Sequence, residues 1–183
     1  MPTMPSDAAD QRVRYAVDPM HTFVTFEVLH FGTSTVRARF DTVDGHLDFD
    51  PASGDGQGRI VIDTQSVSSG IARFDTHLRS AQMLNCSAYP VATYTVDGLQ
   101  YESGKLVTVQ GKLSLLGQTH ALALHCRHAN DYDSPLLQTH VRGGDFETTI
   151  KRSRWGMDWG LDLGIPDDVR LVIQVELAQE KAA

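Results

Sequence analysis

The feature that most restricts the fold of this chain is a two-residue alternation of side-chain type that recurs along most of its length. Residues 22–31 show it most clearly, with β-branched or aromatic side chains at successive even positions. Successive side chains of a β-strand point to opposite faces, so the pattern predicts a strand with one buried face. That face carries Val24, Phe26, Val28 and His30.

Segments of the same kind follow one another with short turns between them, without the helical spacing that joins parallel strands. Many short antiparallel strands are typical of a sandwich or a closed barrel, and closure leaves no exposed sheet edge. We therefore expect an all-β fold, an extended antiparallel barrel of roughly eight strands whose interior can hold one small ligand. The predicted strands are 13–17, 22–31, 36–40, 46–49, one starting at 60, 91–97, 99–102, 105–116, 119–127, 145–151 and 169–177.

Three details of this scheme depend on turn residues. Leu116 and Gly117 predict a tight hairpin between two of the strands. Asp44 and Gly45 leave open whether residues 36–49 form two strands or one bulged strand. Residues 128–144 are polar and contain proline and a glycine pair, so they predict a long loop.

Residues 66–84 interrupt the strands and predict one short helix. Asp75 is expected to cap its N-terminus, because a carboxylate oxygen there accepts hydrogen bonds from unpaired amides. Arg73, His77 and Arg79 place three more ionisable side chains beside it. These charged side chains either bind the polar head of a ligand at the mouth of a barrel or belong to an exposed loop, in which Arg79 pairs with a strand carboxylate. The sequence leaves both readings open.

Length and charge bound the class of protein. A chain of 183 residues fits one domain, which we place at residues 13–178 between a flexible arm, 1–12, and a tail, 179–183. The net charge of −7 argues against nucleic-acid binding, which needs a positive surface. We find no run of ~18 apolar residues and no apolar signal-peptide core. The expected compartment is the cytoplasm for the sequence as given, or the periplasm if an export signal has been removed.

The sequence contains no recognisable catalytic or metal-binding motif. His125 and His128 are three residues apart at a strand end, a spacing that does not place both rings on one face. Neither a Gly-x-Ser-x-Gly elbow nor a His-Glu-x-x-His motif occurs. We therefore predict no catalytic residue, no metal site and no cofactor. Cys86 and Cys126 are either two small, at least half-buried thiols or one disulfide.

Several short motifs follow one another along the chain. They are Tyr15-Ala-Val-Asp18 with His21-Thr22, Val24-x-Phe26-x-Val28-x-His30, Phe40, Gly45-x-Leu47-x-Phe49-Asp50, Ser66-Val67, Phe74-Asp75-x-His77-Leu78-Arg79-Ser80, Tyr89-Pro90, Gly111-x-Leu113-x-Leu115-x-Gly117, and Arg152-Ser153 with Gly156-Met157. They cover residues 13–177, nearly the whole chain. In this order and spacing, the motifs resemble the YceI-like family of lipocalin-like, polyisoprenoid-binding barrels.

The resemblance implies a barrel with a deep apolar interior that binds, transports or stores a long-chain amphiphile without catalysis. The implied ligand is a polyisoprenoid, an isoprenoid quinone or a fatty-acid-like lipid, and a homodimer is implied as well. Polar contacts are expected from Arg73, Asp75, His77 and Arg152. Apolar or mixed contacts are expected from Val24, Phe26, Val28, His30, Phe40, Leu47, Phe49, Leu78, Leu113, Leu115, Trp155 and Met157.

Two alternatives compete with this hypothesis. The interior of a small barrel is often filled by its own side chains, which would leave no room for a ligand. An enzyme that acts on a lipid-like substrate would instead use His21, His30 and His77 with Asp75 as acid–base groups. That mechanism requires the histidines to lie within hydrogen-bond reach of one substrate.

Overall fold

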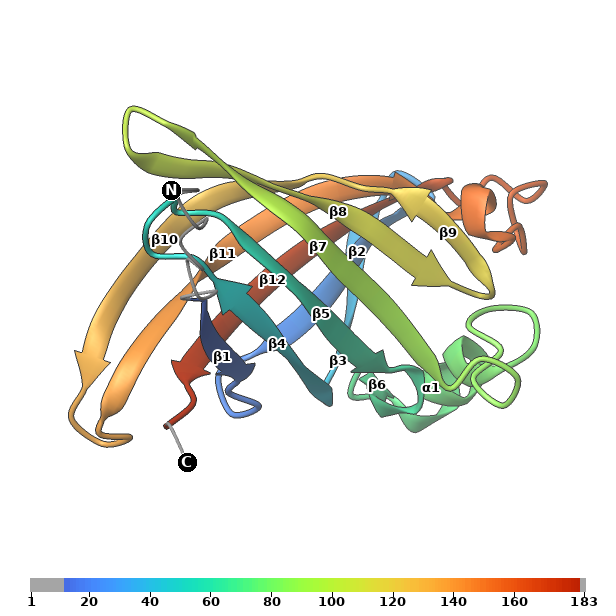
Figure 1. Cartoon of the computed structure of the whole chain (residues 1–183). Helices are drawn as coiled ribbons and strands as arrows, with labels where there is room; N and C mark the ends of the chain where they lie inside the picture. The colour runs from blue at the N-terminus through green and yellow to red at the C-terminus, as the bar shows by residue number, and fades with distance from the viewer. Residues whose placement is uncertain (1–11, 182–183) are drawn as a thin grey trace, which may run out of the picture.

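The chain folds into a closed antiparallel barrel, described over residues 12–181 by a computed structural model (Figure 1). Eight strands form the ring, in the order β1, β4, β5, β7, β8, β10, β11 and β12, and β12 pairs with β1 to close it. The predicted fold class is therefore confirmed. The ring strands are β1 (Val13–Val17), β4 (Val43–Phe49), β5 (Gly56–Asp63), β7 (Val91–Glu102), β8 (Lys105–Leu115), β10 (Leu124–Ser134), β11 (Thr139–Lys151) and β12 (Asp168–Gln179).

The remaining elements extend the barrel at one of its ends. Strands β2 and β3 continue the sheet beyond β12, and β6 pairs with β3. The α-helix and the last 3₁₀-helix lie at this end in Figure 1, away from the tip that joins β7 to β8. These elements are β2 (Phe23–His30), β3 (Ser34–Phe40), β6 (Val67–Ser68), β9 (Gln118–Ala121), α1 (Ala72–Arg79) and two 3₁₀-helices, Thr64–Ser66 and Arg152–Trp155.

Strand β12 fixes the positions of both β1 and β2, which follow one another along it. Its C-terminal end pairs with β1, and its first half pairs with β2. The turn between β1 and β2 is tied to the same strand by Thr22, which is 1% exposed. The Thr22 hydroxyl donates to the carbonyl of Glu176 (3.2 Å) and accepts from the Glu176 amide (3.1 Å). A buried hydroxyl with both roles filled carries no desolvation penalty.

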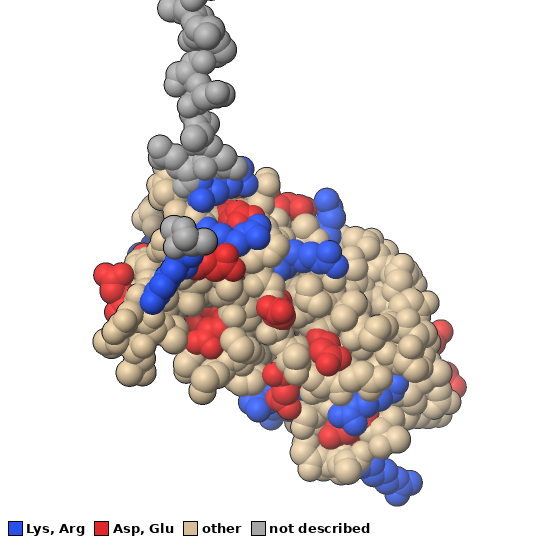
Figure 2. All heavy atoms as spheres, turned by 60° about the horizontal axis from the view of Figure 1, so that its bottom comes forward, with Lys and Arg blue, Asp and Glu red and all other residues tan. Residues whose placement is uncertain are grey.

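The outer surface carries side chains of both charge signs, mixed together on the face that Figure 2 shows. Five of these side chains form a row of ion pairs across neighbouring strands. Arg37 contacts Glu27 (2.8 Å), Arg170 contacts Glu27 (2.7 Å) and Glu147 (2.5 Å), and Arg127 contacts Glu147 (2.9 Å). Hydrogen bonds from Arg37 and Arg170 lower the pKa of Glu27. Such a network cross-links β3, β2, β12, β11 and β10 on the outside.

The predicted loop at residues 128–144 is wrong. Most of this stretch is the hairpin of β10 and β11, with Ser134 paired to Thr139 across its turn. The glycine pair that indicated a loop lies inside β11, where neighbouring strands come close: a Cβ on Gly143 would lie 2.3 Å from the carbonyl oxygen of Val175. A glycine in a strand often marks such a close approach. The polar composition misled because many side chains of this hairpin face solvent.

The predicted role of Asp75 as the helix cap is also wrong. Helix α1 begins at Ala72, and the capping position is Ile71, whose side chain makes no capping bond. Asp75 lies in the first helical turn and accepts hydrogen bonds from the amide (2.7 Å) and hydroxyl (2.5 Å) of Ser69. These bonds lower the pKa of Asp75, and a negative charge in this turn is favoured by the helix dipole.

Other boundaries differ by smaller amounts. Strands β3 and β4 are separate, and residues 91–102 form one strand with register shifts between Val96 and Gly98 and between Gln100 and Tyr101. The hairpin at Leu116 and Gly117 is confirmed, with φ of 51° and 74°, but its second strand breaks between Ala121 and Leu124. Strand β12 continues to Gln179, one residue beyond the predicted domain end. The predicted arm lies outside the described residues apart from its last residue.

Candidate ligand-binding site

The barrel encloses a cavity of ≈ 650 Å³. Its wall is built from side chains on the inner faces of the ring strands, together with β2 and the segment before β10. Most of them are apolar, so the cavity offers a surface that water solvates poorly. The apolar lining residues are Val24, Val43, Leu47, Phe49, Ile60, Ile62, Val96, Leu99, Leu106, Val109, Leu113, Leu122, Leu124, Phe146, Leu171, Ile173, Val175 and Leu177.

The cavity is blind at the end that carries α1. Along β12 the lining extends from Leu177 to Leu171 but excludes Val169, and along β8 it includes Leu113 but excludes Leu115. The excluded side chains belong to the buried core, together with Trp155, which is 1% exposed. The Trp155 indole N–H donates to the carbonyl of Leu113 (3.2 Å). Packed side chains therefore fill the barrel beyond this level.

Polar groups gather at the opposite end, where the β7–β8 tip and the β10–β11 hairpin border the cavity. Tyr101, Lys105, Arg127, Asp131 and Arg142 all line it there. The Arg142 guanidinium carbon lies 3.5 Å from the centre of the Phe49 ring and 5.7 Å from that of Tyr15. Its nearest carboxylate is that of Asp131, at 3.8 Å. We call these five residues the polar mouth.

The Tyr94 hydroxyl is a polar group in the deeper wall, and its hydrogen bonds are satisfied within the protein. The Tyr94 hydroxyl donates to the carbonyl of Leu122 (2.8 Å), across the break between β9 and β10, and lies 3.2 Å from the carbonyl of Val109. Burial raises the pKa of Tyr94, so the phenol stays neutral. It therefore presents a ring rather than a charge to the interior.

The structure brings four of the sequence-predicted contacts together on the cavity wall: Val24, Leu47, Phe49 and Leu113. The other predicted apolar positions do not line it. Phe26 and Phe40 stack on each other, with ring centres 5.7 Å apart. Four others, Leu78, Leu115, Trp155 and Met157, are buried beyond the blind end or beside it. Val28 is half-buried, and His30 is exposed, with its ring in contact with that of Phe31.

The predicted head-group residues lie at the end with α1, away from the polar mouth (Figure 1). Arg73 is exposed. Arg79 donates to the carbonyls of Gln65 (2.9 Å) and Val67 (2.6 Å), so the alternative of a salt bridge to a strand carboxylate is wrong. His77 packs against Trp159 with ring centres 4.5 Å apart, and its buried Nε2 has no hydrogen-bond partner.

Arg152 is buried and serves the protein itself. Its guanidinium donates to the backbone carbonyls of Pro166 (2.9 Å), Met157 (2.8 Å) and Trp159 (2.8 Å). Burial lowers the pKa of Arg152, but an arginine stays charged at neutral pH. These bonds hold the glycine-rich segment that follows β11, which closes one side of the blind end.

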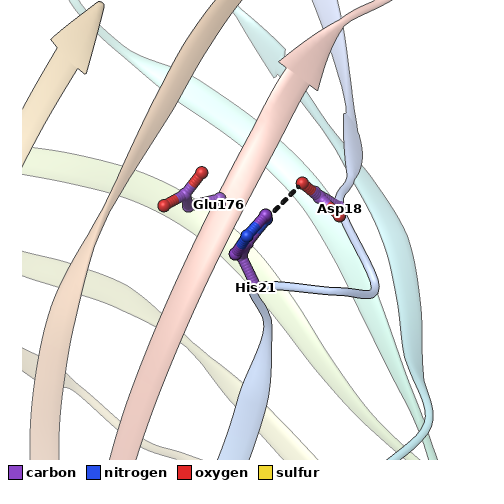
Figure 3. Close-up of side chains that lie close together, drawn as sticks. All are labelled: Asp18, His21 and Glu176. Carbon is purple, nitrogen blue, oxygen red and sulfur yellow. Dashed lines mark hydrogen bonds and ion pairs between the residues drawn. The ribbon is translucent and has the colours of Figure 1, made fainter. Parts of the chain in front are cut away.

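The side chains of Asp18, His21 and Glu176 meet on the outside of the barrel (Figure 3). One possible ligand atom from each lies within 4.8 Å of the others, and this is the one such group of three among residues 12–181. His21 Nδ1 is 2.7 Å from Asp18, and the Tyr132 hydroxyl donates to Glu176 (3.3 Å). His30 and His77 join no such group.

The two cysteines are both free. Cys86 is buried, and its thiol donates to the carbonyl of Thr64 (3.2 Å). Cys126 lines the cavity, and burial raises the pKa of its thiol. The thiol is therefore protonated at neutral pH and adds to the apolar wall.

Sequence reasoning missed all five residues of the polar mouth. Asp131 and Arg142 fall in the stretch that was expected to be a loop, and a loop assignment gives no inward face. A short signal was present in Asp131-Tyr132-Asp133 and His140-Val141-Arg142, where one apolar side chain lies between two polar ones. Two such runs flanking Pro135 would have indicated a hairpin.

A closed antiparallel barrel with a blind, apolar cavity and a polar mouth defines a lipocalin-like ligand-binding barrel. The sequence profile of the YceI-like domain matches residues 15–177, and the chain belongs to this family. Curated relatives include Protein YceI of Salmonella arizonae and of Salmonella paratyphi B, each 32% identical over 171 residues, which span 91% of this chain and 87% of the relative.

Solved structures share the fold. BcnA of Burkholderia cenocepacia superposes with a TM-score of 0.72 at 21% identity, over 87% of this chain and 98% of that one. A polyisoprenoid-binding domain from Saccharophagus degradans superposes with a TM-score of 0.67 at 19% identity, over 92% of this chain and 99% of that one. Members of this family generally have the fold of a binding protein. In the described part of the chain, no helix has the length and apolar character to span a bilayer.

Proposed function

We propose that this protein binds one long-chain amphiphile in the barrel and carries or stores it without chemical change. The apolar cavity carries this proposal, because a wall of aliphatic and aromatic side chains has no other evident use in a barrel of this size. The proposed contacts are Val24, Leu47, Phe49 and Leu113 from the sequence pattern, with Phe146, Ile173 and Val175 added by the structure. The relative that binds polyisoprenoids supports the ligand class.

The cavity volume limits the length of the ligand. At ~30 Å³ for each non-hydrogen atom, the share of one water molecule in the liquid, the ≈ 650 Å³ cavity holds on the order of 20 such atoms. Burying each methylene contributes about 0.8 kcal/mol, so affinity should rise with chain length until the cavity is full. A longer polyisoprenoid would leave its remaining units outside the mouth.

The absence of catalysis is part of the proposal. His21 lies on the outside of the barrel, and His30 and His77 do not line the cavity. A shared substrate for these three histidines and Asp75 therefore has no enclosed place to bind. We expect the bound lipid to be recovered chemically unchanged after incubation with the protein.

Native mass spectrometry of delipidated protein with fatty alcohols of increasing length tests the proposal. One equivalent should bind, with affinity that rises to about 20 chain atoms and then levels off. Lipids co-purified by solvent extraction should fall in the same class. A protein that takes up neither these alcohols nor any other apolar probe would contradict the proposed function.

A further inference from the structure

Arg142 is a cation on the inner face of the barrel. In an antiparallel ladder, residues directly opposite each other point to the same face. Arg142 of β11 is opposite Leu177 of β12 and Asp131 of β10, and all three line the cavity. A charge on a mostly apolar inner face loses solvation, so such a residue is expected to have a partner.

The face of the Arg142 guanidinium is occupied, whereas its edges are free. Its central carbon stacks 3.5 Å from the centre of the Phe49 ring, which restrains its orientation. Within the described residues its nitrogens donate no hydrogen bond. The closest carboxylate oxygen, on Asp131, is 3.8 Å away and already contacts His140 Nε2 at 3.0 Å. Arg142 is thus oriented with donors available to a ligand.

Other arginines differ in this respect. Arg14 has its carboxylate, Asp48, at 2.8 and 2.9 Å. Arg127, which also lines the mouth, donates to Glu147 at 2.9 Å. The mouth therefore combines one arginine that donates to a carboxylate with one that donates no hydrogen bond to the described residues, and Lys105 adds a third positive charge there.

We propose that Arg142 binds the anionic head group of the amphiphile, a carboxylate or a phosphate, while the chain extends toward the blind end. The planar fork of arginine matches two oxygens of either group. Asp131, half-exposed and shared with His140, leaves the edge of the fork free for the ligand. This inference rests on the proposed function, because it assigns the head group of the same ligand.

Competition against the neutral dye N-phenyl-1-naphthylamine tests it with three probes that share one chain: oleate, oleyl phosphate and oleyl alcohol. Hydrogen bonds to a charged partner predict that at least one anion displaces the dye about tenfold more tightly than the alcohol. The Arg142→Gln variant should lose most of that preference and still bind the alcohol as the wild type does. The ranking of oleate and oleyl phosphate distinguishes the two head groups.

Two further variants separate charge, geometry and folding. Arg142→Lys keeps the charge but not the fork, so we expect it to retain only part of the preference. Arg39→Gln is the matched control, since Arg39 also stacks on a phenylalanine, Phe23 at 4.3 Å, yet does not line the cavity. It should leave the preference unchanged, and thermal melts of all variants check the fold.

The outcomes distinguish the two proposals. If the dye and oleyl alcohol bind but neither anion binds more tightly, the head-group inference is overturned and the proposed function stands. The same holds if Arg142→Gln retains the full preference for an anion. If neither the dye nor any lipid binds to the wild type, the proposed function itself fails.

Discussion

At the scale of single residues, buried polar groups of this protein do structural work that their sequence motifs do not reveal. Arg152 and Asp75 both fall in motifs that resemble those of the family, and both make their hydrogen bonds within the protein. A ligand contact and a structural contact use the same donors, so a motif alone cannot separate them. Burial and partner identity can.

Replacing Arg152 by methionine should destabilise the protein by at least about 2 kcal/mol, because several buried carbonyls lose their donor at once. Urea denaturation followed by tryptophan fluorescence measures the change. Arg154→Met is the control, since Arg154 is exposed, and should shift stability by less than about 0.5 kcal/mol. Equal effects of the two variants would contradict the assigned role.

The Asp18–His21 contact predicts a pH window of stability. Burial raises the pKa of Asp18, but hydrogen bonds from His21 and Met20 outweigh burial and lower this pKa overall. The contact with Asp18 also raises the pKa of His21. The contribution of Asp18 to folding stability is present above the ordinary pKa of aspartate. It is lost as the pH falls through the lowered pKa. The His21 contribution is present below the ordinary pKa of histidine and is lost as pH rises through the raised value.

We therefore expect the melting temperature of wild type minus that of His21→Ala to be largest between about pH 4 and 6.5 and to shrink on both sides. Differential scanning calorimetry across that range measures it. His125→Ala is the control for the loss of an exposed histidine that does not contact Asp18. A maximum at alkaline pH would show that the contact does not act through these two charges.

At the scale of elements, strands whose inward face is apolar were predictable, and strand segments with polar residues on that face were not. Strand β2 was found because Val24 and Phe26 alternate with polar residues, and a two-residue period has one structural meaning. The β10–β11 hairpin was missed because Asp131 and Arg142 occupy inward positions where an apolar residue was expected. The ligand site was therefore half predictable: its apolar wall follows from periodicity, whereas its polar mouth depends on long-range pairing.

The close approach of strands at Gly144 gives an element-level prediction. A Cβ there would lie 2.4 Å from the carbonyl oxygen of His128, so Gly144→Ala should force the β10–β11 pair apart and destabilise the protein by about 1–3 kcal/mol. Gly98→Ala is the control, because its nearest neighbour would be an Asp55 side-chain oxygen at 3.5 Å. Chemical denaturation of both variants should show a clear loss only for Gly144→Ala.

At the scale of the whole molecule, a closed ring of strands encloses a cavity, and the residues at the ends of the barrel determine the depth of that cavity. Leu113 lines the cavity next to its blind end. Leu113→Trp should therefore shorten the cavity at its blind end and shift the preferred fatty-alcohol length to shorter chains. We expect the substitution to lower the free energy of unfolding by about 1–3 kcal/mol. Binding across the length series measures the shift, and an unchanged optimum in a folded variant would place the blind end elsewhere.

The blind end also determines how one ligand can be replaced by another. A tube open at both ends allows an incoming molecule to push the resident one out at the far side. With a single opening, the resident molecule must leave through the mouth before the next can enter, so the exchange rate equals the rate of departure and does not depend on the concentration of the newcomer. In such a protein, selectivity among competing lipids is expressed as residence time.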